Sequence, residues 1–272
     1  MPIDRKPWRR TFEKGTPPYL PCPYCNNGKL KLCESSLSLG QTAGSLSEQD
    51  EDGWDPELTN GKSSCVFKCN NPGCRGAVAC CAHYGVERQQ TGEDEFDLIE
   101  VHSPRYFDPP LPVFRIPRDC PEMVRKDVEG AFALHWADPM SAANRIRSAL
   151  ERLMDHARIP RRKRDGKGSS YRLQLHNRIQ EYGKKAKDKR LVSIMTAMKW
   201  IGNEGSHGGK LSRDDVFDAF DLLEHTLKQI FDDSTTSLVA LSQKINRKKG
   251  PLSRQRQVKA KAKVQKAAER QA

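Results

Sequence analysis

Residues 22–25 read Cys-Pro-Tyr-Cys and residues 69–74 read Cys-Asn-Asn-Pro-Gly-Cys, and these two stretches decide how the first part of the chain folds. Each stretch places a thiol at either end of a turn, and Asn, Pro and Gly favour such turns. Four thiolates fill the tetrahedral shell of a zinc ion and leave no open position for water. The spacing therefore predicts one structural Zn²⁺ ion, with the ligands Cys22, Cys25, Cys69 and Cys74.

The remaining cysteines leave alternatives open. The chain of 272 residues holds nine cysteines, and eight of them fall between Cys22 and Cys81. A local cluster with an odd total is typical of a metal site in a reducing compartment and not of a secreted disulfide scaffold. Cys65 can replace one of the four ligands, and Cys33 can belong to either set. A second site from Cys80, Cys81 and His83 is the other alternative, but the adjacent Cys80 and Cys81 cannot easily point to one metal, so both are predicted to be packing residues.

Composition divides the chain into three predicted domains. Residues 1–117 carry the cysteine cluster and are expected to form a small zinc-ribbon-like β region. Within this region, residues 34–62 are rich in Ser, Gly and acidic residues, which predicts a flexible, solvated insertion. A proline-rich link at residues 108–117 leads to a helical domain at 118–235, and a basic tail follows at 236–272.

Apolar residues at helical spacing predict about five helices in the second domain. One helix begins with Asp138-Pro139, a capping Asp followed by Pro at the first helical position. Residues 161–170 are predicted to be a basic, glycine-containing loop. The fourth helix ends at Gly202 or soon after, and the fifth follows the cap-like residues 212–215. The expected fold class is therefore α+β, with the β region followed by an all-α helical bundle.

The positive charge is concentrated at one end of the chain. The formal net charge is +12, and residues 244–272 hold eleven basic residues and one acidic residue. Cations without aromatic neighbours bind phosphate backbones with no sequence preference. The tail is therefore predicted to bind nucleic acid (RNA or DNA) or an acidic protein, and the alternative is a solubilising extension. The predicted contacts are Arg247, Lys248, Lys249, Arg254, Arg256, Lys259, Lys261 and Lys263.

The hydropathy pattern contains no membrane signal. Hydrophobic residues make up 36% of the chain and charged residues 30%, and no apolar run approaches the length of a membrane span. Residues 1–10 lack the apolar segment of a signal peptide. These observations predict a cytoplasmic protein that does not bind membranes.

Three features in order resemble one known family: the cysteine knuckle, residues 145–151 (RIRSALE) and residues 201–207 (IGNEGSH). They are similar to the bacterial family catalogued as domain of unknown function 4145, over residues 22–231 without the acidic insertion. The resemblance implies a HEPN-like helical bundle. Proteins of the HEPN superfamily are often dimers, occur in toxin–antitoxin, restriction and phage-defence systems, and in many cases are metal-independent ribonucleases.

The resemblance also implies candidate catalytic residues. The ribonuclease signature of the superfamily is Arg, a polar residue, three further residues and His. Asn203 and His207 match its polar and His positions, whereas Gly202 replaces the Arg. The His exchanges a proton with the attacking 2′-hydroxyl or the leaving oxygen, and the Arg stabilises charge on the phosphate. Lys199, one helical turn earlier, or Arg145 from another helix is the expected replacement.

A structural interpretation competes with this catalytic one. Gly202 and Asn203 can form a left-handed helix cap, and His207 can bond to backbone carbonyls. Glu151 is expected to pair with Arg147 at i, i+4. The leading prediction is therefore a non-catalytic adaptor that binds nucleic acid or protein, and the alternative is a metal-independent ribonuclease. The expected assembly is a homodimer or a multi-protein defence complex, as the resemblance implies.

Overall fold

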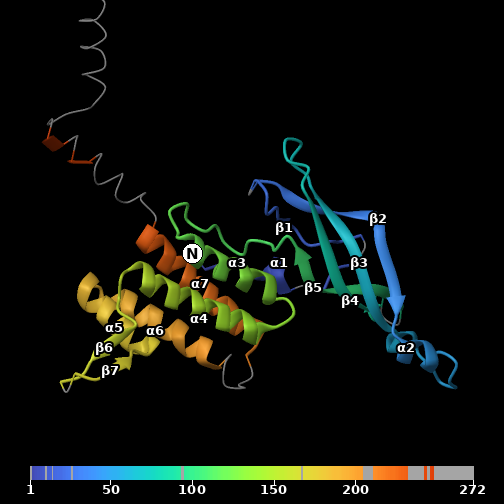
Figure 1. Cartoon of the computed structure of the whole chain (residues 1–272). Coiled ribbons are helices and arrows are strands. Elements are labelled where there is room, and N and C mark those ends of the chain that lie inside the picture. The colour runs from blue at the N-terminus through green and yellow to red at the C-terminus, as the bar shows by residue number, and fades with distance from the viewer. Residues whose placement is uncertain are drawn as a thin grey trace, which may run out of the picture. The chain divides into compact units, whose positions relative to one another are not determined.

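The computed structural model describes residues 2–9, 11–13, 15–25, 27–92, 95–166, 168–204 and 211–231, and also residues 242, 243, 246 and 247. The chain divides into two compact units, Met1–Leu227 and Lys228–Ala272. The first unit has a mixed α+β fold in which a sheet precedes a group of helices (Figure 1). The domain boundaries predicted after residues 117 and 235 stay predictions.

The sheet is antiparallel, with five strands in the order β1-β2-β3-β4-β5. Every second residue of β3 is buried from Gly61 to Cys69, and the same alternation runs from Val78 to Tyr84 in β4. One face of these strands therefore packs on the core and the other faces solvent. The strands are β1 (Leu20–Pro21), β2 (Lys29–Gln41), β3 (Asn60–Cys69), β4 (Ala77–Gln90) and β5 (Phe96–Asp108).

The sheet extends further than the small zinc-ribbon-like region that the sequence predicts. Residues 34–62, predicted to be a flexible insertion, form the outer part of β2, the helix α2 (Ala43–Glu48), the 3-10 helix η1 (Pro56–Leu58) and the start of β3. The ladder between β2 and β3 resumes at Ser38–Ser64 and continues to Gln41–Gly61. Backbone pairing, which polar composition does not reveal, therefore orders this segment.

Within the described residues five helices follow the sheet, as the sequence predicts, and none of them combines the length and apolar character needed to cross a membrane. Asp138 caps α4, because its Oδ1 accepts the backbone N–H of Ser141 at 2.9 Å. Ser212 and Asp215 form a reciprocal cap at the start of α7. The backbone N–H of Ser212 donates to the Asp215 carboxylate, and the backbone N–H of Asp215 donates to Ser212 Oγ. The helices are α3 (Glu122–Leu134), α4 (Pro139–His156), α5 (Leu175–Ala186), α6 (Lys189–Glu204) and α7 (Arg213–Phe231).

The helical half is not all-α, because the predicted loop at residues 161–170 is part of a two-stranded hairpin. Strand β6 (Arg162–Arg164) pairs with the antiparallel strand β7 (Ser170–Arg172). Gly168 has φ +84° in the connection, a left-handed conformation that glycine adopts without steric cost. The hairpin extends away from the neighbouring helices in Figure 1.

Aromatic side chains join the sheet to the helices within the first unit. The ring of Phe107 in β5 lies 5.0 Å from the ring of Trp136, which follows α3. Trp8 of the short helix α1 (Lys6–Arg9) contacts Trp136, His135 and Phe217 of α7 at 5.6–6.2 Å between ring centroids. Burial lowers the pKa of His135 to about 3, so this histidine is neutral in the core.

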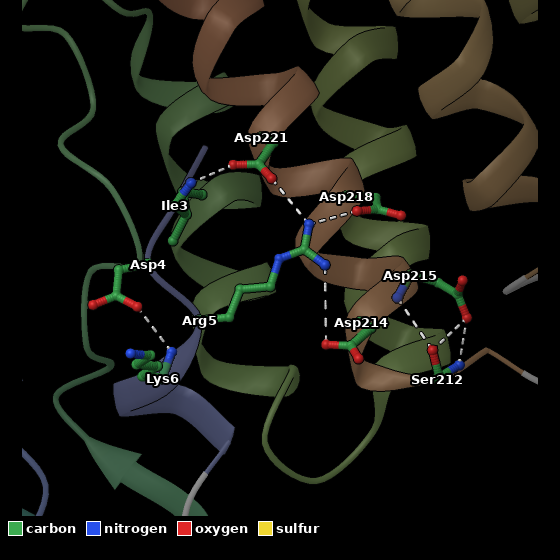
Figure 2. A network of polar contacts seen from close by, with 9 residues as sticks. All are labelled: Ile3, Asp4, Arg5, Lys6, Ser212, Asp214, Asp215, Asp218 and Asp221. Atoms are coloured by element: carbon green, nitrogen blue, oxygen red, sulfur yellow. Dashed lines mark hydrogen bonds and ion pairs between the residues drawn. The ribbon is translucent and has the colours of Figure 1, made fainter. Parts of the chain in front are cut away.

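A charged network fastens the N-terminal segment to α7 (Figure 2). The Arg5 guanidinium bonds to Asp218 and Asp221 and lies 4.0 Å from Asp214. The backbone N–H of Ile3 donates to Asp221 Oδ1 at 2.7 Å. The three carboxylates are spaced four and three residues apart and so share one helix face. A cation from the N-terminal segment therefore neutralises an acidic stripe on α7.

Candidate metal centre and basic cavity

Four thiols converge at one end of the sheet. Cys22 and Cys25 belong to the turn after β1, Cys69 ends β3, and Cys74 lies between β3 and β4. Their Sγ atoms all lie within 4.8 Å of one another. These are the four cysteines that the sequence predicts as zinc ligands.

The distances between the sulfur atoms fit tetrahedral coordination. The Sγ atoms of Cys22 and Cys74 are 3.8 Å apart, and those of Cys25 and Cys69 are 3.7 Å apart. Four thiolates at about 2.3 Å from a tetrahedral zinc ion lie about 3.8 Å from one another. The four cysteines could therefore hold a metal ion, and their soft sulfur donors are compatible with zinc.

Backbone amides donate to two of the clustered thiols and favour the thiolate at Cys25, whereas burial raises the pKa of Cys69 to about 12. Gly28 N–H donates to Cys25 Sγ at 3.3 Å, and Asn71 N–H donates to Cys69 Sγ at 3.4 Å. Hydrogen bonds from the backbone of Asn27 and Gly28 lower the pKa of the Cys25 thiol to about 6. A Cβ at Gly28 would lie only 2.2 Å from Cys69 Sγ, so this close approach requires glycine.

The alternative cysteine sites do not assemble in the described part of the chain. Cys65 and Cys80 are both buried and lie opposite each other in β3 and β4. Cys81 and His83 are on the solvent face of β4, so Cys80 points away from them. Cys33 lies on β2 with its Sγ 3.5 Å from Ser35 Oγ. Among the described residues these side chains form no further group of three potential metal ligands.

A second feature is a basic cavity in the helical half, with a volume of about 720 Å³. Side chains of α4, α5, α6 and β7 line it, together with the residues beside β6 and β7. Cations outnumber anions in this lining, so the cavity attracts negatively charged ligands. Its six cations are Arg147, Arg152, Arg161, Arg172, Arg178 and Lys199, and its two carboxylates are Glu151 and Asp155.

Asp155 orders two of these arginines. Arg178 is only 5% exposed, and its Nη2 donates to Asp155 Oδ1 at 2.7 Å and to the carbonyl of Ile159 at 2.9 Å. Arg161 Nε donates to Asp155 Oδ1 at 2.8 Å. The hydrogen bonds from Arg161 and then Arg178 lower the pKa of Asp155 to about 2. The carboxylate is therefore charged at neutral pH and holds both guanidinium groups in place.

Three buried nitrogen atoms of the lining have no hydrogen-bond partner among the described residues. They are Nε of Arg147, Nε of Arg178 and Nδ1 of His176. An unpaired buried polar group costs about 1–3 kcal/mol, so most such groups in proteins are satisfied by protein, water or ligand.

Two of the predicted catalytic residues, Lys199 and Asn203, line this cavity. Lys199 is 9% exposed, and its Nζ lies 3.2 Å from the centre of the Trp200 ring. Burial, and then the charge of Arg147, lower the pKa of the Lys199 ammonium group. Burial and the nearby Arg147 both disfavour the charged form of Lys199. An anionic ligand in the cavity would favour that charged form.

Arg145, another predicted catalytic residue, does not line the cavity. Arg145 points to α3 instead, where its Nη1 bonds to Asp127 Oδ1 at 3.1 Å. His207 lies outside the described residues. Of the predicted tail contacts, Arg247 is described as an exposed residue, and the other seven also lie outside.

Gly202 and Asn203 do not form a left-handed cap, because α6 continues to Glu204. A Cβ at Gly202 would lie 2.6 Å from Arg147 Cβ and 3.2 Å from the carbonyl oxygen of Ala143. Glycine therefore lets α6 approach α4 closely. This contact brings Arg147 into the cavity that Lys199 and Asn203 line.

Most cavity residues had little signal in the sequence. Arg147 was visible in the RIRSALE stretch, and its predicted i, i+4 pair with Glu151 is present at 3.4 Å between Nη2 and Oε1. Arg161 precedes β6 and belongs to the run of basic residues at 161–164, which was the available signal, whereas Arg172 is the last residue of β7 and lies outside that run. Arg178 had no signal, since its burial depends on a contact with Ile159 of another segment.

These features define an α+β protein with a four-cysteine cluster and a basic cavity in its helical half. Residues 129–257 match the family described as Domain of unknown function (DUF4145), which is the family that the sequence resembles. Residues 10–111 match a separate family, Domain of unknown function (DUF8608), and this match contains all four clustered cysteines. No curated protein and no solved structure matches the chain.

Proposed function

We propose that this chain is a zinc-stabilised, non-catalytic protein that binds nucleic acid through phosphate groups held in the basic cavity. The supporting observation is that six cationic side chains line one cavity against two carboxylates. Arginine matches phosphate oxygens with two parallel hydrogen bonds, and five of the six cations are arginines. In this proposal the basic tail adds phosphate contacts of its own, and an acidic protein is the competing partner.

The proposed zinc ion has a structural role. Four protein thiolates complete its coordination, so no position is open for water or substrate. The ion would join the turn after β1, which holds Cys22 and Cys25, to Cys69 at the end of β3 and Cys74 in the turn that follows. The free energy of metal binding would therefore contribute to the stability of the sheet.

The test is the affinity for a labelled oligonucleotide, measured by fluorescence anisotropy between about 50 and about 200 mM salt. Arg147→Ala and Arg172→Ala should each weaken binding about tenfold at low salt and reduce the salt dependence, because each removes a charged contact to phosphate. Arg145→Ala is the matched control, since Arg145 lies on the same helix as Arg147 but bonds to Asp127. Equal losses in all three variants would contradict the proposal.

A truncation before Lys244 separates the cavity from the tail. The shortened chain should keep binding that depends on Arg147, with lower affinity and a shallower salt dependence. If truncation abolishes binding and the cavity variants have no effect, the tail is the binding element. If polyglutamate competes as well as the oligonucleotide, the partner is an acidic protein.

A second candidate function, metal-independent RNA cleavage, is favoured by the position of Arg147. Arg147 packs against Gly202 and lines the cavity beside Lys199 and Asn203. It would supply the guanidinium that the motif lacks at residue 202. His207 would exchange the proton of the 2′-hydroxyl or the leaving oxygen, and Asn203 would position the phosphate. The homodimer and the defence complex stay predictions from the family resemblance.

Cleavage of a mixed pool of single-stranded and structured RNA separates the two functions. The buffer should lack Mg²⁺ but contain no chelator, because a chelator would also remove a structural zinc ion. Cleavage by the wild type that is lost in His207→Ala and reduced in Arg147→Lys would establish the enzyme. Binding without cleavage by the wild type would reject it and leave the non-catalytic function.

A further inference from the structure

A second cavity, which we call the sheet hollow, lies on the sheet and has a volume of about 550 Å³. It is lined by residues 38–40 of β2, 62–64 of β3, 81–83 of β4 and 105 of β5. Its volume is in the range of small-molecule sites. The sheet hollow shares no lining residue with the basic cavity, so the two are separate candidate sites.

Neighbouring strands bring the first polar groups of the sheet hollow together. Lys62 of β3 pairs with His83 of β4, and both side chains are on the solvent face. Paired residues of antiparallel strands have Cβ atoms about 4.5–5.5 Å apart. Gly40 of β2 pairs with Lys62 on the other side, and a Cβ added there would meet no atom within 4 Å. The missing side chain therefore leaves the space beside Lys62 open.

A β-bulge brings Arg105 to the same place. Tyr106 pairs with Cys81 and Pro104 pairs with Ala82, so Arg105 between them is the extra residue of β5. Bulges change the direction of a side chain and are common next to functional sites. The bulge thus accounts for an arginine in the lining of the sheet hollow.

The sheet hollow holds positive charge without a counter-charge of its own. Lys62 and Arg105 line it, and no carboxylate does within the part of the chain that the structure describes. Burial, and then the charges of Lys62 and Arg105, lower the pKa of His83. Arg105 Nη2 donates to the carbonyl of Ala137 at 2.8 Å, which positions the guanidinium and leaves its other N–H groups for a ligand. An anion in the sheet hollow would be attracted by both cations.

Exposed hydroxyls and one exposed thiol also line the sheet hollow. Ser64 lies in the ladder between Ser38 of β2 and Cys81 of β4, and all three residues are exposed. A hydroxyl donates a hydrogen bond to an anionic oxygen, as does the N–H of a neutral imidazole. Cys81 supplies a thiol whose chemical reactivity depends on its access to solvent.

We propose that the sheet hollow binds the phosphate group of a small phosphorylated molecule. A phosphate monoester carries a charge of about −1.5 to −2 at pH 7, which matches the two cations. Arg105 and Lys62 neutralise this charge, and His83, Ser38 and Ser64 donate to the phosphate oxygens. This site goes beyond the proposed function, because it uses neither the basic cavity nor a nucleic acid.

The test is the rate at which iodoacetamide alkylates Cys81 in the full chain, mapped by mass spectrometry. Glycerol phosphate, compared with sodium chloride at equal ionic strength, should slow this alkylation and reach a plateau. Cys33 of β2 is the internal control, because it lies outside the sheet hollow and its alkylation should not change. Lys62→Gln should raise the concentration for half-protection about tenfold, since one charged hydrogen bond is lost. Gly40→Val should also weaken protection by glycerol phosphate, because its side chain would occupy the sheet hollow.

Lys31→Gln is the matched control variant, because Lys31 is an exposed lysine of β2 that does not line the sheet hollow. Arg147→Ala, which alters the basic cavity, should leave the protection of Cys81 unchanged. Equal protection of Cys81 and Cys33, or equal effects of Lys62→Gln and Lys31→Gln, would overturn the proposal. Stronger protection by an oligonucleotide than by glycerol phosphate would also overturn it, since the ligand would then be nucleic acid. None of these outcomes changes the test of the basic cavity by oligonucleotide anisotropy.

Discussion

Gly202 of α6 and Arg147 of α4 are in such close contact that a Cβ on Gly202 would lie 2.6 Å from the Cβ of Arg147. The atom it would meet is the Cβ of Arg147, which cannot move aside as the end of the side chain could. The carbonyl oxygen of Ala143 would lie 3.2 Å from the added Cβ. The glycine thus sets the spacing of the two helices, and the helix spacing sets the position of a cavity arginine.

Gly202→Ala should therefore destabilise the protein by about 1–3 kcal/mol, the usual cost of overpacking a close contact. Oligonucleotide affinity should fall in the same variant, since α4 and Arg147 have to move. Urea denaturation measures the first effect and anisotropy the second. Gly44→Ala is the control, because Gly44 lies in α2 with no neighbour within 4 Å of the added methyl group. If the two variants are equally stable, close helix approach is not the role of Gly202.

Gly28→Ala should disrupt metal binding without removing any ligand. The added Cβ would lie 2.2 Å from Cys69 Sγ and 3.3 Å from Cys25 Sγ, so both thiolates would have to leave the tetrahedral arrangement. Zinc transfer to a chromogenic chelator should be at least about tenfold faster than in the wild type, in line with losses seen when a metal shell is disturbed. Gly73→Ala, in the other knuckle, should behave as wild type because its nearest contact is 3.6 Å away. Equal release from both variants would contradict the proposed geometry.

Local patterns made part of this structure predictable. The five helices follow from apolar spacing, and the start of α4 follows from Asp138-Pro139, because capping and helix periodicity involve neighbours in sequence. The cysteine pairs were also sufficient to predict which four thiols cluster, since chemistry limits which side chains hold a metal ion. The helices and the cap depend on interactions between residues close in sequence. The cysteine cluster depends on the chemistry of a single residue type.

The outer part of the sheet and the basic cavity were not predictable, because they depend on contacts between segments that are distant in sequence. Residues 38–41 (Ser-Leu-Gly-Gln) lack the apolar alternation of a strand, yet they join the sheet because β3 offers a free edge to pair with. The cavity likewise depends on tertiary contacts, such as the bond from Arg178 to the carbonyl of Ile159 and the packing of Arg147 on Gly202. Arg145 and Arg147 are two residues apart on one helix, and only the packing of α3 and α6 decides which of them enters the cavity.

The N-terminal segment should stabilise α7 through Arg5. Arg5→Ala should lower the free energy of unfolding by about 1 kcal/mol at low salt, because three carboxylates on one helix face lose their shared cation. The loss should shrink as salt is raised, since the ions screen partly exposed charges. Lys6→Ala controls for the removal of a neighbouring positive charge. In a double-mutant cycle, Asp218→Asn should cost less stability in the Arg5→Ala background than in the wild type, and additive losses would mean that the two residues are not coupled.

The stabilisation that Asp155 provides should depend on pH in a defined range. Hydrogen bonds from Arg161 and Arg178 lower the pKa of Asp155 from 3.8 to about 2 in the folded state. A lowered pKa contributes stability that is complete above the unfolded value and is lost as pH falls toward the folded value. Asp155→Asn should therefore be less stable than the wild type at pH 7, by about 1–3 kcal/mol, because Arg178 is left buried without its carboxylate.

Thermal unfolding measured from neutral pH down to about pH 2 should show this difference in stability between Asp155→Asn and the wild type narrowing below about pH 4. Acid also releases metal from thiolates in both proteins, so only the difference between them reports on Asp155. A difference that stays constant down to the lowest pH would show that the pKa of Asp155 is not lowered by the two arginines.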